Sequence, residues 1–168
     1  VISVLSDVYE SLARHGVENV LTVNGHRLAN LPAIDIAAKR VREEHPEVFF
    51  ATVDLVRIGV RSHTELRDGD PEDGMHGGEF ETSLMLALCP ELVGDDREGE
   101  LWDEQYDWGG QDLLEGGPLS VYRGFDEYSE SGAIGAPELA SAERGERFYE
   151  VLTEELAALL TAIHEHNR

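Results

Sequence analysis

The sequence of 168 residues contains one cysteine, Cys89, so no disulfide can form within the chain. Cys89 lies in an apolar run, where a small buried side chain is the ordinary interpretation. Long hydrophobic runs are also absent, and we expect no membrane-spanning segment. The first residues lack the pattern of a secretory signal peptide. Together these absences predict a cytoplasmic protein.

Basic residues are scarce, and Lys39 is the only lysine. The chain carries 35 acidic and 13 basic residues, a formal net charge of −22. Such a charge repels phosphate backbones and anionic lipid surfaces, so neither nucleic acid nor a membrane is an expected partner. An acidic surface almost without lysine suggests adaptation to high salt, which screens self-repulsion. An ordinary acidic cytoplasmic protein is the alternative.

Several common functional motifs are missing. The sequence has no Walker-type phosphate loop, no zinc-finger spacing, no Gly-x-Ser-x-Gly elbow and no Gly-x-Gly-x-x-Gly turn. These absences exclude the commonest nucleotide-binding and serine-hydrolase signatures.

Hydrophobic periodicity predicts an α/β fold in a single domain over residues 1–168. A helix that ends before Gly16 precedes a β-α-β unit, which implies a parallel sheet. We expect strands at Val17–Val23 and Val48–Leu55, with a helix between them from about Asn30 to His45 that carries Pro32 in its first turn.

The second half of the chain is less regular. Residues 57–78 are predicted to be a loop, and Phe80–Leu88 a mostly buried helix. Residues 94–120, rich in Asp, Glu and Gly, are too long for an ordinary connection and indicate a functional excursion or an oligomer contact. A glycine-rich turn region at 128–141 leads into a long amphipathic helix from Ala142.

Asn24-Gly25-His26 is the first candidate site. It directly follows a predicted buried strand, and ligands of α/β sheets bind beyond the carboxyl ends of the strands. His26 is therefore placed where a metal ligand or a general base would lie. The alternative is a histidine that only forms hydrogen bonds within a turn.

The second candidate is the block from His76 to Ser83. Gly77 and Gly78 allow a ligand to approach the backbone closely, and the N-terminus of the following helix favours negative charge. Glu81 precedes an uncharged run, so we expect it to be partly buried with a metal or a histidine as partner. The alternative is that Glu79 and Glu81 only cap the helix.

These residues resemble the creatininase family of amidohydrolases. The resemblance rests on Asn24-Gly25-His26, on the block from His76 to Leu86, on Pro90-Glu91-Leu92-Val93 and on the closing segments 135–137 and 140–146. It implies a three-layer α/β/α fold with a mostly parallel sheet, hexameric assembly, and hydrolysis of a small amide, linear or cyclic, by a metal-activated water. The cofactor implied is a divalent metal, zinc first, with manganese or iron as alternatives.

The resemblance also assigns roles to residues. His26 is a metal ligand, and His76 handles the proton during ring opening. Glu81 is a carboxylate of the metal site or of its surroundings, with a catalytic role. Arg27, Gly77 and Gly78 are assigned to substrate binding.

The sequence departs from the family at several points. The family's first segment supplies a Glu-x-His block and an aspartate, and we expect these N-terminal βα units to be missing here. Arg27 and Leu28 stand where creatininase has Tyr and Glu, and Glu72 or a neighbour replaces a tryptophan. Creatinine is therefore not the expected substrate. Two functions stay open: a metal-dependent amidohydrolase, or a truncated, inactive member that acts as a binding or assembly subunit.

Overall fold

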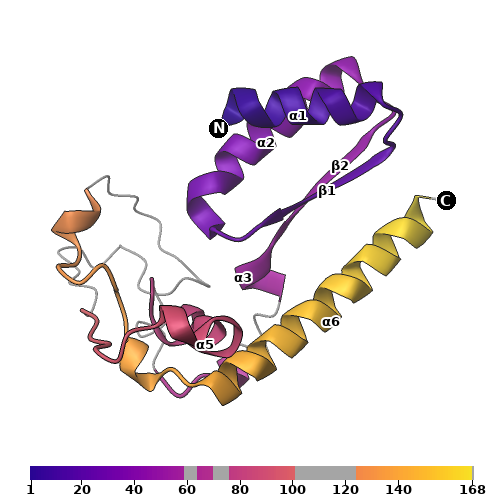
Figure 1. The fold of residues 1–168 in the computed structure, drawn as a ribbon. Coiled ribbons are helices and arrows are strands. Elements are labelled where there is room, and N and C mark those ends of the chain that lie inside the picture. The colour runs from indigo at the N-terminus through magenta and orange to yellow at the C-terminus, as the bar shows by residue number, and fades with distance from the viewer. Residues whose placement is uncertain (59–63, 70–75, 101–123, 168) are drawn as a thin grey trace. The chain divides into compact units, whose positions relative to one another are not determined.

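The computed structural model describes residues 1–58, 64–69, 76–100 and 124–167 (Figure 1). The chain divides into two compact units, Val1–Ile58 and Gly59–Arg168, which are described in turn. The expectation of a single domain over residues 1–168 stays a prediction.

The first unit is a parallel strand pair with two helices on one side (Figure 1). Its elements follow the chain as α1 (Ile2–Arg14), β1 (Asn19–Asn24), α2 (Arg27–Glu44), β2 (Phe49–Asp54) and one helical turn, α3 (Leu55–Ile58). Strands β1 and β2 pair in parallel from Asn19 opposite Phe49 to Asn24 opposite Asp54. The predicted α/β class and the parallel β-α-β unit are confirmed.

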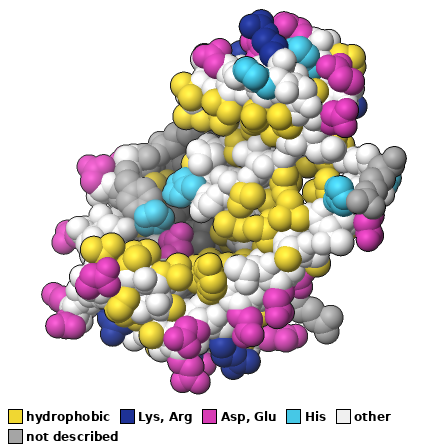
Figure 2. Space-filling view, turned by 45° about the vertical axis from the view of Figure 1, so that its right-hand side comes forward, with side chains coloured by type: hydrophobic (Ala, Val, Ile, Leu, Met, Phe, Trp, Pro, Cys, Tyr) yellow, Lys and Arg dark blue, Asp and Glu magenta, His cyan; other side chains and the backbone are white. Residues whose placement is uncertain are grey.

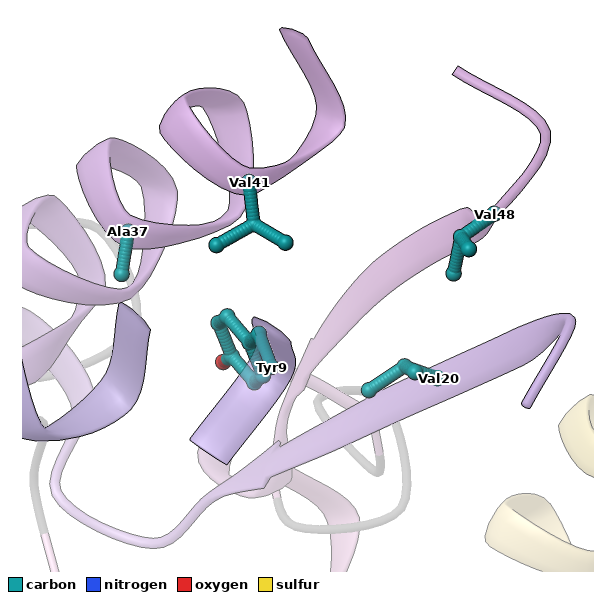
Figure 3. Close-up of a cluster of buried hydrophobic side chains, with 5 residues drawn as sticks. All are labelled: Tyr9, Val20, Ala37, Val41 and Val48. Atoms are coloured by element: carbon teal, nitrogen blue, oxygen red, sulfur yellow. The ribbon is translucent and has the colours of Figure 1, made fainter. Parts of the chain in front are cut away.

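A small apolar core holds this unit together (Figure 3). It consists of Tyr9 from α1, Val20 from β1, Ala37 and Val41 from α2, and Val48 beside β2. The side chain of Tyr9 is 3% exposed, and its hydroxyl lies 2.6 Å from the Thr22 hydroxyl. A tyrosine can be buried here because a partner on the strand satisfies its polar end.

The predicted start of α2 was wrong by about one turn. The helix begins at Arg27, with His26 as its N-terminal flanking residue, so Pro32 lies inside the helix. A proline there has no N–H to donate to the preceding turn, which normally disfavours the position. The position of Pro32 therefore predicted roughly where the helix begins, but not its first residue.

The second unit is built around two helices, α5 (Glu79–Leu88) and α6 (Ala142–His166). The helices cross closely, because Gly145 of α6 lies against the backbone of Ser83 in α5. Beside this crossing the rings of Phe80 and Phe148 meet edge to face at 4.9 Å. The other described elements of this unit are a helical turn at residues 64–66 and single 3-10 turns at Pro90–Leu92, Phe125–Glu127 and Pro137–Leu139.

Two predictions for this half need correction. Helix α5 is not mostly buried: it buries Glu79, Phe80 and Ser83, whereas Met85 and Leu88 are exposed. The segment 57–78 is not wholly loop, because α3 extends through residue 58 and residues 64–66 are helical. Helix α5 has only 10 residues and α3 only 4, and the helical stretch 64–66 is shorter still, so these elements are too short for periodicity to decide. Of the predicted excursion at 94–120, residues 101–120 lie outside the described part of the chain.

The surface carries the acidity expected from composition. Figure 2 shows scattered carboxylate side chains on the face in view, and fewer basic ones. Within the described ranges, every helix is too short or too polar to cross a membrane.

Candidate functional site

The loop His76-Gly77-Gly78 leads directly into α5, and its backbone is fixed by a short antiparallel bridge. His76 donates its N–H to the Ile134 carbonyl at 2.8 Å and accepts the Ile134 N–H at 2.7 Å. Gly77 adopts φ +61°, a left-handed conformation in which a side chain would be strained. The histidine side chain is half-buried at this junction.

Glu81 reaches back to this loop from the first turn of α5. Its Oε2 accepts the Gly77 N–H at 2.6 Å, while the Thr82 hydroxyl donates to the Gly77 carbonyl at 2.8 Å. Both polar groups of the Gly77 backbone are thus bound by side chains of the helix that the loop precedes. This is the capping contact considered from the sequence, and the assignment of Glu81 to a metal stays a prediction.

Glu79 is a buried carboxylate that the sequence did not single out. Its side chain is 2% exposed and accepts the N–H groups of Asp68 and Gly69, each at 2.9 Å. Arg144 of α6 lies 2.7 Å from Glu79 Oε1, also pairs with Asp68, and donates to the Leu139 carbonyl at 2.8 Å. From the sequence, Glu81 was expected to be the partly buried carboxylate; Glu81 is half-buried, whereas the fully buried carboxylate is Glu79, with Arg144 as its partner.

The Glu79–Arg144 pair borders an open space. Arg144 and Asp68 line a cavity of about 440 Å³ together with residues that include Glu65, Ser141 and Arg147. Its lining is charged and of mixed sign, so the cavity has no single electrostatic preference.

A carboxylate also holds the turn that pairs with His76. Glu100 accepts the hydroxyl of Ser131 at 2.7 Å, the N–H groups of Ser131 and Glu130 at 3.1 and 3.2 Å, and the hydroxyl of Ser129. The hydroxyl of Ser129, followed by that of Ser131, lowers the pKa of Glu100 from 4.5 to about 2. Ile134, which forms isolated β-bridges with both Glu100 and His76, follows this turn.

The first unit presents a polar group at the carboxyl end of its strands. Asn24 is 2% exposed, and its Oδ1 accepts the His26 N–H at 3.2 Å and contacts the Asn30 amide at 3.5 Å. Asp54, opposite Asn24 in the sheet, accepts the Val56 N–H at 3.1 Å. Asn24 therefore holds the turn that carries the exposed His26. Asp54 was not proposed as a candidate from the sequence. It could have been, because Asp54 lies at the end of a strand, and His26 was chosen for following a strand end.

The described residues do not make up a complete metal centre. Among residues 1–58, 64–69, 76–100 and 124–167, no three His, Cys, Asp or Glu side chains are grouped as a metal site requires. His26 belongs to the first unit and Glu81 to the second, where its carboxylate already accepts a backbone N–H. The side chain of Arg27 lies outside what the structure describes.

Comparisons with known proteins identify the family. The model of the creatininase family, described as creatinine amidohydrolase, matches residues 1–160. The chain is 36% identical over 101 residues to the creatinine amidohydrolase of Pseudomonas putida, an alignment that covers 55% of this chain and 39% of that protein.

Solved structures agree with this result. A mutant creatininase of the zinc–zinc type superposes with a TM-score of 0.76 at 26% identity, over 98% of this chain and 62% of that one. A mutant creatininase complexed with creatine gives 0.68 at 26% identity, over 98% and 63%. The chain thus spans less than two thirds of these relatives, and the predicted creatininase-like fold is confirmed. The chain belongs to the creatininase family.

Proposed function

We propose that this chain is part of a metal-dependent amidohydrolase that cleaves the C–N bond of a small amide, linear or cyclic. The observation that carries the proposal is the loop at His76, whose backbone is bound to Ile134 on one side and to α5 on the other. Membership of the creatininase family supports the reaction class.

His76 is the proposed proton-transfer residue. Imidazole titrates near neutral pH, so it can accept and return a proton during amide cleavage. Catalysis of this kind requires the ring to be held in one place, and the two Ile134 hydrogen bonds fix the His76 backbone. Gly77 and Gly78 carry no side chain that would keep a ligand away from the backbone, and they are kept as substrate-binding candidates on the family resemblance.

Metal dependence is part of the proposal because a related creatininase is of the zinc–zinc type. The ion would supply the positive charge that polarises an amide carbonyl. His26 is the proposed donor of this chain, and the remaining donors would come from residues outside those described or from another polypeptide. Glu81, which binds Gly77, better suits a role in holding the loop. Arg27 is kept as a substrate-binding candidate, and the proposed assembly is a homo-oligomer, both on the family resemblance.

The experiment is a screen of the full chain against small linear and cyclic amides, with Zn²⁺, Mn²⁺ or Fe²⁺ supplied and with each omitted. Mass spectrometry detects the cleaved product. We expect metal-dependent turnover that His76→Gln lowers by about 10²–10⁴-fold, the range of general acid–base catalysis. His164→Gln, in the exposed last turn of α6, is the matched control and should leave turnover unchanged.

Two results would contradict the proposal. A turnover rate that is unchanged in His76→Gln would show that His76 does not transfer the proton. Failure to cleave any amide with metal supplied would favour the other function considered from the sequence, a catalytically inactive binding or assembly subunit.

A further inference from the structure

A buried pair of opposite charges in the second unit has no part in the proposed chemistry. Glu79 is 2% exposed, and the side chain of Arg144 is 16% exposed. Removing two charges from water is costly unless the geometry satisfies both of them. Here it does: the Glu79 carboxylate receives two backbone N–H groups besides Arg144, and Arg144 also binds Asp68 and the Leu139 carbonyl.

The pair joins three stretches of chain that are far apart in sequence. Asp68 and Gly69 come from segment 64–69, Glu79 from the start of α5, and Arg144 from the first turns of α6. The planar guanidinium fork can reach several oxygens in fixed directions, which a lysine ammonium does not reproduce. The contact therefore sets the position of the start of α5 as well as adding stability.

The start of α5 is also where the His76 loop is anchored. Glu79 follows Gly78 directly, and the residues that follow it at the start of the same helix, Glu81 and Thr82, bind the Gly77 backbone. A displacement at Glu79 would therefore pass to Gly77 through these two side chains. The Ile134 bridge holds the other side of His76, so the two anchors together fix the backbone from which the imidazole projects.

We infer that Glu79 and Arg144 are positioning residues for His76, acting through the first turn of α5; this role in catalysis rests on the proposed function. Neither residue touches the reacting atoms. Loss of the pair releases the first turn of α5 and allows the His76 ring to occupy more than one position.

The test follows the His76 ring directly by NMR of the full chain labelled with ¹³C-histidine, and it needs no turnover. The His76 signal is assigned by its loss in His76→Gln. The variants are Glu79→Gln and Arg144→Lys, the second of which keeps the charge but loses the fork and is the milder change if Glu79→Gln does not fold. Phe148→Leu is the control, because it loosens the packing of α5 on α6 without altering any charge. All spectra are recorded well below the melting temperature of each variant.

We expect one His76 signal in the wild type and in Phe148→Leu, and a shifted or split signal in Arg144→Lys and Glu79→Gln. An unchanged His76 signal in both charge variants would overturn the inference, since the pair would then only stabilise the fold. An equal change in Phe148→Leu would overturn it too, because any loosening would then have the same effect.

Kinetics provide the second readout if an amide substrate is found. Displacement of a catalytic group costs about a hundredfold in kcat with KM nearly unchanged, whereas simple destabilisation lowers only the amount of active protein. A wild type that cleaves nothing would count against the proposed function, and the NMR result would still decide whether the pair positions His76.

Discussion

Replacement of Gly145 by alanine tests the close crossing of α5 and α6. Gly145 is buried within α6 and has an ordinary helical backbone, so in an isolated helix alanine would be favoured by about 1 kcal/mol. In this protein, however, an added Cβ would lie well inside 3.0 Å of the Ser83 carbonyl oxygen and 2.9 Å from the Ala87 Cβ. The atoms nearest to the added Cβ belong to the backbone of Ser83, which cannot rotate away as a side chain can.

The two effects oppose each other, and their magnitudes decide the sign. Overpacking in a close-packed interior costs about 1–3 kcal/mol, and a clash with backbone belongs near the upper end. Subtraction of the helix-propensity gain leaves a net destabilisation of about 2 kcal/mol. In a chain of this size that corresponds to a fall in Tm of about 4–8 °C.

Urea and thermal unfolding followed by circular dichroism measure this change. Gly94→Ala is the control, because a Cβ there meets nothing within 4 Å, and we expect its stability to stay within about 0.5 kcal/mol of the wild type. A Gly145→Ala protein as stable as the wild type, or more stable, would refute the close crossing as described.

Two further predictions concern hydrogen bonds. The pKa of Glu100 is lowered from 4.5 to about 2 in the folded chain, so its stabilisation is present above pH 4.5 and is lost as the pH falls toward 2. The stability difference between wild type and Glu100→Gln in urea should therefore be largest near neutral pH and shrink on acidification; a difference independent of pH would contradict the assignment. Tyr9→Phe should destabilise the first unit by about 0.5–1.5 kcal/mol, because the hydroxyl bound to Thr22 is lost. A double-mutant cycle with Thr22→Val measures the coupling, and a coupling energy of zero would exclude the bond.

The first unit was predictable from the sequence because its elements differ in local pattern. Hydrophobic patterning predicted strands at Val17–Val23 and Val48–Leu55, which correspond to β1 and β2, and a helix ending before Gly16, which is α1. The boundaries were less accurate, as the early start of α2 shows. Helix ends depend on hydrogen bonds such as that from His26 N–H to Asn24, which local composition does not specify.

The buried carboxylate of the candidate site shows why other features could not be predicted. Glu79 and Glu81 both lie in the first turn of α5, where any acidic residue is favoured by the helix dipole. Residues two apart point to nearly opposite sides of a helix, so only one of the two can face the protein. The run that follows is apolar on most faces, and it therefore gave no indication which side that would be.

Two weaker signals in the sequence could have resolved this ambiguity. Glu79 shares a helix face with Ser83, a small residue of the kind found where helices approach closely, whereas Glu81 shares its face with the exposed Met85. In α6, Gly145 within a helical pattern marks a close approach, and Arg144 stands next to it. Two small residues that meet across a helix crossing bring their neighbours together, and an arginine on one helix then selects the glutamate on the facing side of the other. Had the small residues been used to orient the helices, the sequence would have pointed to Glu79 and Arg144 as the buried pair and left Glu81 to cap the loop at Gly77.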